Sequence, residues 1–214
     1  MLAGSFPKVT VILRGYTYSQ IRTVVKNLVG TELKAVEITM NTPNALDTIK
    51  KISEEFGESI MVGAGTVLTY EEAQQAIEAG AAFLLAPTLF EKRVLDLCKE
   101  KNVISVPGAF SPSEIRQCFL DGADIVKVFP AARLGSHYLK DIAAPLGKMP
   151  LMVVGGVNTG NVREYLEAGA AFAGIASGIF RKEDILCENE EGIRASISAM
   201  EETLKGLWED TIHG

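Results

Sequence analysis

Two ionisable residues, Lys127 and Glu37, lie inside short hydrophobic runs of the kind that form buried strands. Lys127 is found in DIVKVFP and Glu37 in AVEIT. Burial disfavours charge and lowers the pKa of a lysine, so a buried lysine amine can act as a nucleophile near neutral pH. A carboxylate beside it can move a proton to or from a substrate. The two residues together predict that a ketone condenses with Lys127 to form an iminium, while Glu37 moves the proton that lets a C–C bond break or form.

Structural roles for the same residues remain open at this point. A structural lysine would pair with an acid or extend its amine to solvent at the strand end. Glu37 would then form an ion pair with Lys127 or Arg14 and have no chemical role. As an anion, Glu37 also opposes the activation of the lysine, because it stabilises the charged amine.

A second group of residues suits an anionic ligand. The segments VVGGV and GIASG contain Gly155, Gly156 and Ser177. Glycines let the backbone approach a phosphate, and amides at helix N-termini bind anions. We therefore expect these residues to supply amide and hydroxyl donors to a phosphate, although a glycine pair also suits a tight turn. The glycines of VGAGT, before Thr66, either serve a ligand or make room inside a barrel.

The elements that must position these residues follow a repeat. Four glycines each end an amphipathic segment and precede a hydrophobic run: Gly30, Gly80, Gly122 and Gly169. Such glycines are typical of helix C-termini, and the runs after them predict buried strands. VTVIL at residues 9–13 and the runs IMVGAGTV, VISVPGAF and LMVVGGV bring the strands to eight. Eight hydrophobic strands alternating with helices predict a single-domain (β/α)8 TIM barrel over residues 1–214, in the α/β class.

Strand alternation and the last helix are two further expectations. Lys127 shares a strand face with Ile125 and Phe129, whereas the valines on either side of it take the other face. The last helix is expected in ISAMEETLKGLW, within the segment 182–214, with ENEEG as a solvated turn before it.

TIM-barrel active sites lie at the C-terminal ends of the strands, where these polar residues are expected: Arg14, Glu37, Thr39, Asn41, Thr66, Thr88, Lys127 and Ser177.

Composition argues against several classes of function. The chain has 21 Lys and Arg against 27 Asp and Glu, a net charge of −6, so no nucleic acid and no anionic membrane is expected as a partner. Its three cysteines are dispersed and its two histidines are His137 and His213, so neither a disulfide framework nor a metal centre is expected, and no cofactor is predicted. No hydrophobic run reaches the ~20 residues of a membrane span, and the expected location is the cytoplasm.

Six motifs occur together along nearly the whole chain: VEIT, VGAGTVL, AP, SVPGA, VKVFPA and VVGGV. In this combination the chain resembles the class I aldolases that cleave 2-keto-3-deoxy-6-phosphogluconate and 4-hydroxy-2-oxoglutarate. The resemblance implies that Lys127 forms the Schiff base, that Glu37 shuttles the proton, and that Thr66 and Pro87 line the site of the pyruvyl carboxylate. It also implies a homotrimer that needs no metal and a phosphate site at Gly155, Gly156 and Ser177. Phe129, on the face of Lys127, is expected to contact the substrate as well.

Two positions depart from the family pattern. Where the family usually has an arginine that grips the substrate carboxylate, this chain has Asn41, and Arg14 at the end of the first strand is the expected substitute. Val154 replaces the family threonine before the glycine pair. The expected reaction is the reversible cleavage of 2-keto-3-deoxy-6-phosphogluconate to pyruvate and glyceraldehyde 3-phosphate. The alternatives are 4-hydroxy-2-oxoglutarate, the galactonate epimer, or a barrel of another class that binds a phosphosugar as an isomerase or sensor.

Overall fold

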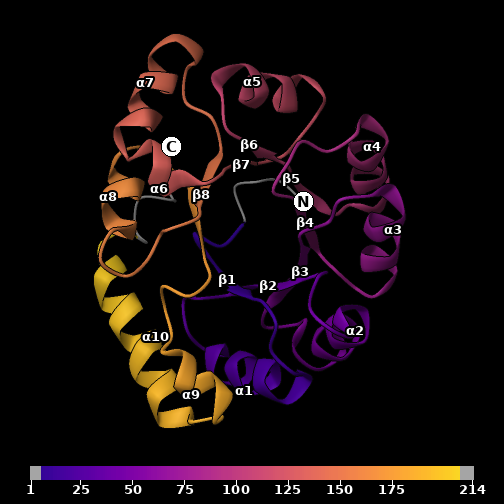
Figure 1. Ribbon diagram of the computed structural model, residues 1–214, viewed down its shortest axis with the longest axis vertical. Coiled ribbons are helices and arrows are strands. Elements are labelled where there is room, and N and C mark those ends of the chain that lie inside the picture. The colour runs from indigo at the N-terminus through magenta and orange to yellow at the C-terminus, as the bar shows by residue number, and fades with distance from the viewer. Residues whose placement is uncertain (1–5, 208–214) are drawn as a thin grey trace.

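The computed structural model describes residues 6–207 as a ring of parallel strands surrounded by helices (Figure 1). The strands are β1 (Val9–Leu13), β2 (Ala35–Thr39), β3 (Met61–Gly65), β4 (Phe83–Leu85), β5 (Ile104–Val106), β6 (Gly108–Ala109), β7 (Val126–Val128), β8 (Leu151–Val154) and β9 (Phe172–Ile175). Their order in the sheet is β5-β4-β3-β2-β1-β9-β8-β7-β6. The two outermost strands, β5 and β6, are separated in the chain by Pro107 alone, so the sheet closes on itself. The predicted (β/α)8 TIM barrel is confirmed.

Pro107 divides one of the expected strands into β5 and β6. Proline has no backbone N–H to donate to the ladder, and β5 pairs with β4 while β6 pairs with β7. The carbonyl of Pro107 still accepts a hydrogen bond from the amide of Lys127, at 2.8 Å. The additional strand is therefore a break in an expected strand and does not change the architecture.

Helices follow the barrel strands and cover their outer faces. Their bounds are α1 (Tyr18–Leu28), α2 (Ala45–Phe56), α3 (Tyr70–Glu78), α4 (Lys92–Lys101), α5 (Pro112–Leu120), α6 (Ala131–Leu134), α7 (His137–Leu146), α8 (Val162–Glu167), α9 (Lys182–Leu186) and α10 (Glu190–Leu204). Thr17, Thr69 and Ser111 form capping boxes at the starts of α1, α3 and α5. The glycines expected to end helices have positive φ angles, from 83° at Gly30 to 113° at Gly169, and are confirmed in that role. No helix within residues 6–207 has both the length and the hydropathy of a membrane span.

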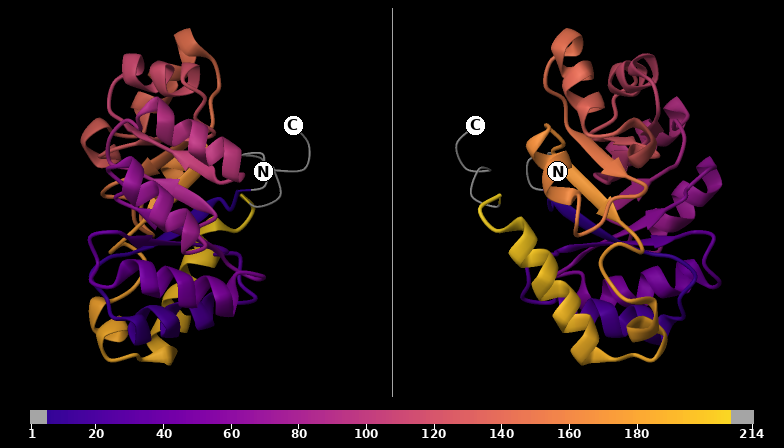
Figure 2. Two further views of the ribbon diagram at one scale, coloured as in Figure 1. Left: turned by 90° about the vertical axis from the view of Figure 1, so that its right-hand side faces the viewer. Right: turned by 60° about the vertical axis from the view of Figure 1, so that its left-hand side comes forward.

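The last helix begins earlier than expected. α10 starts at Glu190, so part of the acidic run expected as a solvated turn forms its first turn, where negative side chains interact favourably with the helix dipole. The short α9 before it has no clear sequence signal. α10 packs against α1 on the outside of the barrel (Figure 2). α10 also ends earlier than expected, at Leu204, whereas the predicted segment continues to residue 208. Residues 208–214 lie outside the described residues.

Strand side chains alternate between the barrel interior and the surrounding helices. Ile125 belongs to a small hydrophobic cluster inside the barrel, and Phe129 packs against that cluster. Val126 and Val128 belong instead to the larger hydrophobic core between the strands and the helices. The predicted alternation on this strand is therefore confirmed, and it directs Lys127 into the barrel.

Aromatic rings fill the end of the barrel where the strands begin. Phe6 packs edge-on against Phe83 and Phe172, with ring centroids 5.1 and 5.3 Å away. Phe83 and Phe172 are the first residues of β4 and β9, and Phe6 precedes β1. This aromatic cluster leaves the opposite, C-terminal end of the barrel for the ionisable residues.

Candidate active site

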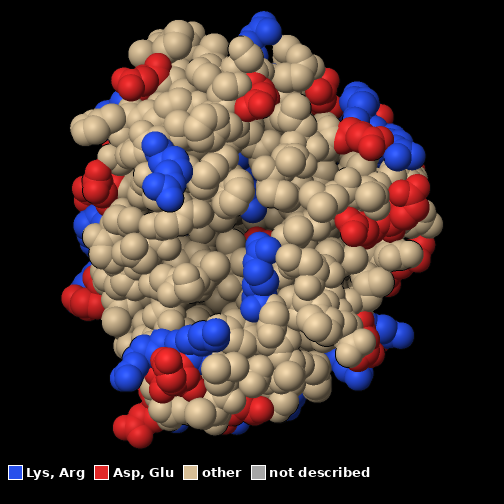
Figure 3. Space-filling model, viewed as in Figure 1, with Lys and Arg blue, Asp and Glu red and all other residues tan. Residues whose placement is uncertain are grey.

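The predicted site residues converge on one cavity at the C-terminal ends of the strands. The cavity has a volume of about 360 Å³, and it opens as a hollow at the centre of the face in Figure 3, with charged atoms inside it. All the residues predicted to act in catalysis or substrate binding, except Asn41, line it: Arg14, Glu37, Thr66, Pro87, Lys127, Phe129, Gly155, Gly156 and Ser177. These residues are far apart in the chain and are brought together by the closure of the barrel.

Lys127 is buried in the wall of this cavity. It is 5% exposed, and its Nζ lies 4.9 Å from the centre of the Phe129 ring. Within the described chain, no hydrogen bond or ion pair holds its amine. Burial lowers the pKa of Lys127, the negative charge of Glu37 raises it in part, and the positive charge of Arg14 lowers it again. The structure therefore offers neither acid pairing nor exposure to support a purely structural role.

Glu37 is the second buried ionisable group in the cavity. It is 1% exposed, and its Oε2 has no hydrogen-bond partner among the described residues. Burial raises its pKa, while Lys127 and Arg14 act in the opposite direction. A carboxyl group with a raised pKa gains and loses a proton closer to neutral pH than an exposed one does, which suits proton transfer.

The glycines of the VGAGT segment make room inside the barrel. A Cβ atom at Gly65 would lie 1.5 Å from Oε1 of Glu37, and one at Gly63 would lie 2.4 Å from the ring of Phe83. Gly65 thus leaves space for the carboxyl group, and Gly63 leaves space for the interior packing.

Arg14 and Thr66 lie together at one side of the cavity. Nη2 of Arg14 donates to Oγ1 of Thr66 at 3.4 Å. Thr66 has a φ angle of 55°, a left-handed conformation that is rare for a β-branched residue and costs free energy. Thr66 follows β3 and lines the cavity together with Arg14. Pro87, which follows β4, is half-buried and lines the cavity as well.

The loops after β8 and β9 form the opposite side. Gly155 and Gly156 have φ angles of 93° and 79°, and a Cβ at Gly156 would lie 2.4 Å from the Cβ of Ala132. The position therefore requires glycine for both its conformation and its space. Ser177 is exposed beside them, in the loop after β9.

Three other polar residues predicted at strand ends lie elsewhere. Asn41 is exposed and does not line the cavity, and Thr88 is likewise exposed outside it. Thr39 is fully buried, and its hydroxyl is 3.0 Å from that of Thr42. The cavity also includes residues that sequence reasoning did not select: Ile12, Val157, Asn158, Gly174, Ala176 and Gly178. Two of them, Gly174 and Gly178, are the glycines of the GIASG motif. The other four have no distinctive sequence pattern of their own.

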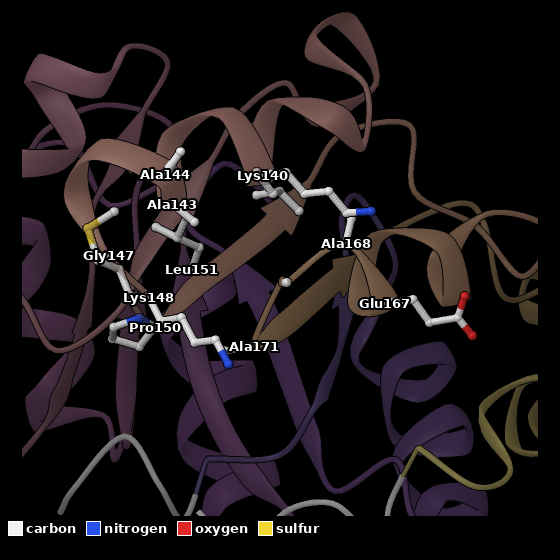
Figure 4. Close-up of a pocket in the computed structure, with 13 residues that line it drawn as sticks. Lys140, Ala143, Ala144, Gly147, Lys148, Pro150, Leu151, Glu167, Ala168 and Ala171 are labelled. Atoms are coloured by element: carbon white, nitrogen blue, oxygen red, sulfur yellow. The ribbon is translucent and has the colours of Figure 1, made fainter.

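A second cavity, of about 780 Å³, lies between α7, α8 and the start of β8. Its ionisable residues are Lys140, Lys148 and Glu167, and Figure 4 shows that these side chains do not point toward one another. Most of the remaining lining is apolar. This cavity does not bring reactive groups together as the first one does.

The sequence matches the KDPG and KHG aldolase family over residues 5–195. A probable 2-dehydro-3-deoxy-6-phosphogalactonate aldolase of Rhizobium meliloti is 31% identical over 79% of this chain and 80% of its own length. The 2-dehydro-3-deoxy-phosphogluconate aldolase of Treponema pallidum is 35% identical over 67% of this chain and 68% of its own. A KDPG aldolase of Legionella pneumophila, solved with pyruvate captured as a covalent carbinolamine, has 26% identity and a TM-score of 0.83 over 92% of this chain and 96% of its own.

The barrel fold, the match and the relatives define an aldolase, a carbon–carbon lyase. The chain belongs to the KDPG and KHG aldolase family.

Proposed function

We propose that Lys127 forms a Schiff base with the C2 ketone of a 2-keto-3-deoxy-6-phospho sugar acid, and that the protein cleaves this compound as a class I aldolase. The observation that carries the proposal is a lysine amine that is buried, unpaired among the described residues and directed into the cavity beside Glu37. Desolvation favours the neutral amine, which is the nucleophilic form. The covalent carbinolamine of the Legionella relative supports the same chemistry.

The proposed reaction balances without a cofactor or metal. The amine of Lys127 adds to C2 and expels water, which leaves an iminium. Glu37 takes the proton of the C4 hydroxyl, directly or through water, the C3–C4 bond breaks, and its electron pair enters the iminium to form an enamine while the aldehyde departs. Glu37 in its protonated form then delivers a proton to C3. Water finally hydrolyses the pyruvyl iminium and frees both pyruvate and Lys127.

The two ends of the cavity match the two anionic ends of such a substrate. Arg14, Thr66 and Pro87 are assigned to the pyruvyl carboxylate, and Phe129 to the wall beside the reacting carbon. The amides of Gly155 and Gly156 and the hydroxyl of Ser177 are assigned to the phosphate. Local donors are needed because the chain as a whole carries a net charge of −6 and repels an acidic substrate.

The gluconate epimer is the substrate that the sequence predicts. The galactonate epimer is a second candidate, because the Rhizobium meliloti relative and an Escherichia coli relative, 27% identical over 91% of this chain, are named for it. Both give pyruvate and glyceraldehyde 3-phosphate. Values of kcat/KM for the two epimers and for the unphosphorylated 4-hydroxy-2-oxoglutarate distinguish these substrates.

Borohydride reduction in the presence of pyruvate tests the chemistry. We expect a reduced pyruvyl adduct on Lys127, located by peptide mass, and none in the Lys127→Ala variant. Thermal stabilisation by phosphosugars without any adduct would instead identify a barrel that binds phosphosugars but breaks no C–C bond.

We also propose a cytoplasmic homotrimer. The support is the resemblance to trimeric aldolases and the likeness, at 26% identity and a TM-score of 0.81, to a chain of a protein cage built by fusing symmetric oligomeric domains. Light scattering on the purified protein tests the trimer, and fractionation of cells that produce it tests the location.

A further inference from the structure

A buried pair of hydroxyl groups links the ends of β1 and β2. Thr39 is 0% exposed and Thr42 is 3% exposed, and their Oγ1 atoms lie 3.0 Å apart. The amide of Gly15 donates to Oγ1 of Thr42 at 2.9 Å, and the amide of Thr42 donates to the carbonyl of Thr39 at 2.9 Å. The side chain of Thr42, in the loop after β2, thus joins this loop to the loop after β1 by a hydrogen bond.

The amide that donates its hydrogen bond to Oγ1 of Thr42 belongs to the peptide bond between Arg14 and Gly15. Gly15 has a φ angle of 75°, a left-handed turn immediately after the arginine. Glycine alone tolerates this turn easily, but its freedom also makes the turn easy to change. The hydrogen bond to Thr42 removes that freedom on the C-terminal side of Arg14.

The other end of Arg14 reaches the cavity. Its guanidinium donates to Thr66 at 3.4 Å, and its charge lowers the pKa of both Glu37 and Lys127. Arg14 is otherwise exposed, and a long exposed side chain has many rotamers. Which of these rotamers are allowed depends on the backbone angles of Arg14, so holding the backbone limits the directions that the guanidinium can take.

We propose that Thr42 is a positioning residue: it fixes the Arg14–Gly15 peptide and so directs the guanidinium toward the carboxylate of the substrate. The inference rests on the proposed function, in which Arg14 binds that carboxylate. It also assigns a role to the loop after β2. Asn41 is exposed and outside the cavity, so this loop acts on the site through the buried Thr42.

The test measures the pyruvate concentration that gives half-maximal borohydride trapping on Lys127. Thr42→Val keeps the shape of the side chain and removes the acceptor, and we expect the half-maximal concentration to rise about three- to tenfold. Thr42→Ser restores the hydroxyl and returns the value to within about twofold of the unaltered protein. Thr48→Val is the matched control, because Thr48 is a buried threonine of α2, at 2% exposure, that does not line the cavity.

Methyl pyruvate separates positioning from general loosening, because it has the same ketone but no negative charge. Its half-maximal concentration should be the same in the unaltered protein and in Thr42→Val. In an Arg14→Met background, Thr42→Val should have no further effect on pyruvate, because a residue that acts through Arg14 has nothing left to position. If Thr42→Val does not fold, Thr42→Ala lacks the same hydroxyl and enters the same comparison.

Three results would overturn the inference alone: pyruvate trapping that is unchanged in Thr42→Val, an equal loss in Thr42→Val for methyl pyruvate, or an equal loss when Thr42→Val is made in the Arg14→Met background. A complete lack of adduct on Lys127 in the unaltered protein is a different result. It would overturn the proposed function, and this inference with it.

Discussion

Gly65 of β3 lies beside Glu37 of β2 in the barrel. Because Gly65 has no side chain, the carboxyl group of Glu37 has space beside it. A Cβ at Gly65 would lie 1.5 Å from Oε1 of Glu37, well inside any allowed contact. The glycine is therefore part of what defines the position of the proposed proton shuttle, although it carries no chemistry of its own.

Gly65→Ala should displace the carboxyl group and lower kcat about 10²- to 10⁴-fold, the usual contribution of a positioned general acid or base. Steady-state kinetics on either sugar acid measures the loss. Glu37→Gln should lose a similar amount, and the double variant should be no worse than Glu37→Gln alone, because both changes remove one function. Additive losses would show that Gly65 matters for another reason.

The pH dependence of imine formation should shift in opposite directions in two variants. Only the neutral amine adds to pyruvate, so the trapping rate rises with pH through the pKa of Lys127. Glu37 raises this pKa and Arg14 lowers it. Glu37→Gln should therefore move the rise to lower pH, and Arg14→Met should move it to higher pH. Shifts of the same sign in both variants would contradict the assigned electrostatics.

Lys127→Met should abolish turnover and stabilise the fold near pH 7. Burial lowers the pKa of Lys127 in the folded state from its ordinary value of 10.5. Between these two pKa values the unfolded chain binds more protons than the native chain, so the stability of the unaltered protein rises with pH. The methionine should raise the free energy of unfolding at pH 7, and the gain should shrink as the pH approaches 10.5. Urea unfolding at several pH values measures it.

Gly156→Ala should weaken the response to the phosphate. The new Cβ would meet Ala132 at 2.4 Å and would require a φ angle of 79°, so the loop must move. We expect kcat/KM for the phosphorylated substrate to fall at least about tenfold, the effect of losing one hydrogen bond to a charged group. The unphosphorylated 4-hydroxy-2-oxoglutarate serves as the internal control, since its kcat/KM should be nearly unchanged.

Asn41→Ala should leave KM within about twofold of its original value, as surface substitutions usually do. Asn41 is exposed and outside the cavity lining. A large rise in KM would show that Asn41 reaches the substrate when the substrate is bound. Asn41→Arg provides the complementary measurement: a lower KM for the gluconate substrate would show that this loop can still supply a carboxylate ligand.

The strand-level features could be predicted from sequence because each depends on a local pattern. Hydrophobic runs identify the strands, glycines identify helix ends, and alternation directs Lys127 inward beside Ile125 and Phe129. The split at Pro107 follows from the missing N–H of proline, but its consequence, two strands with different partners, depends on the closure of the sheet.

The features that could not be predicted depend on contacts between distant residues. The hydroxyl of Thr42 meets Gly15 and Thr39 only after β1 and β2 are side by side. The left-handed backbone of Thr66 opposes the preference of a β-branched residue, so tertiary structure must impose it. The acidic start of α10 resembles a solvated turn in composition, and only its position on the barrel distinguishes the two.

The aromatic cluster of Phe6, Phe83 and Phe172 has a kinetic consequence. It fills the end of the barrel opposite the cavity, so substrate enters and products leave through the same opening. In the proposed reaction, the pyruvyl fragment is bonded to Lys127 in the interior, whereas the phosphate end lies beside the exposed Gly156. The aldehyde therefore departs before pyruvate. In the synthetic direction pyruvate must bind first, which makes addition compulsorily ordered and should make pyruvate a competitive inhibitor of cleavage.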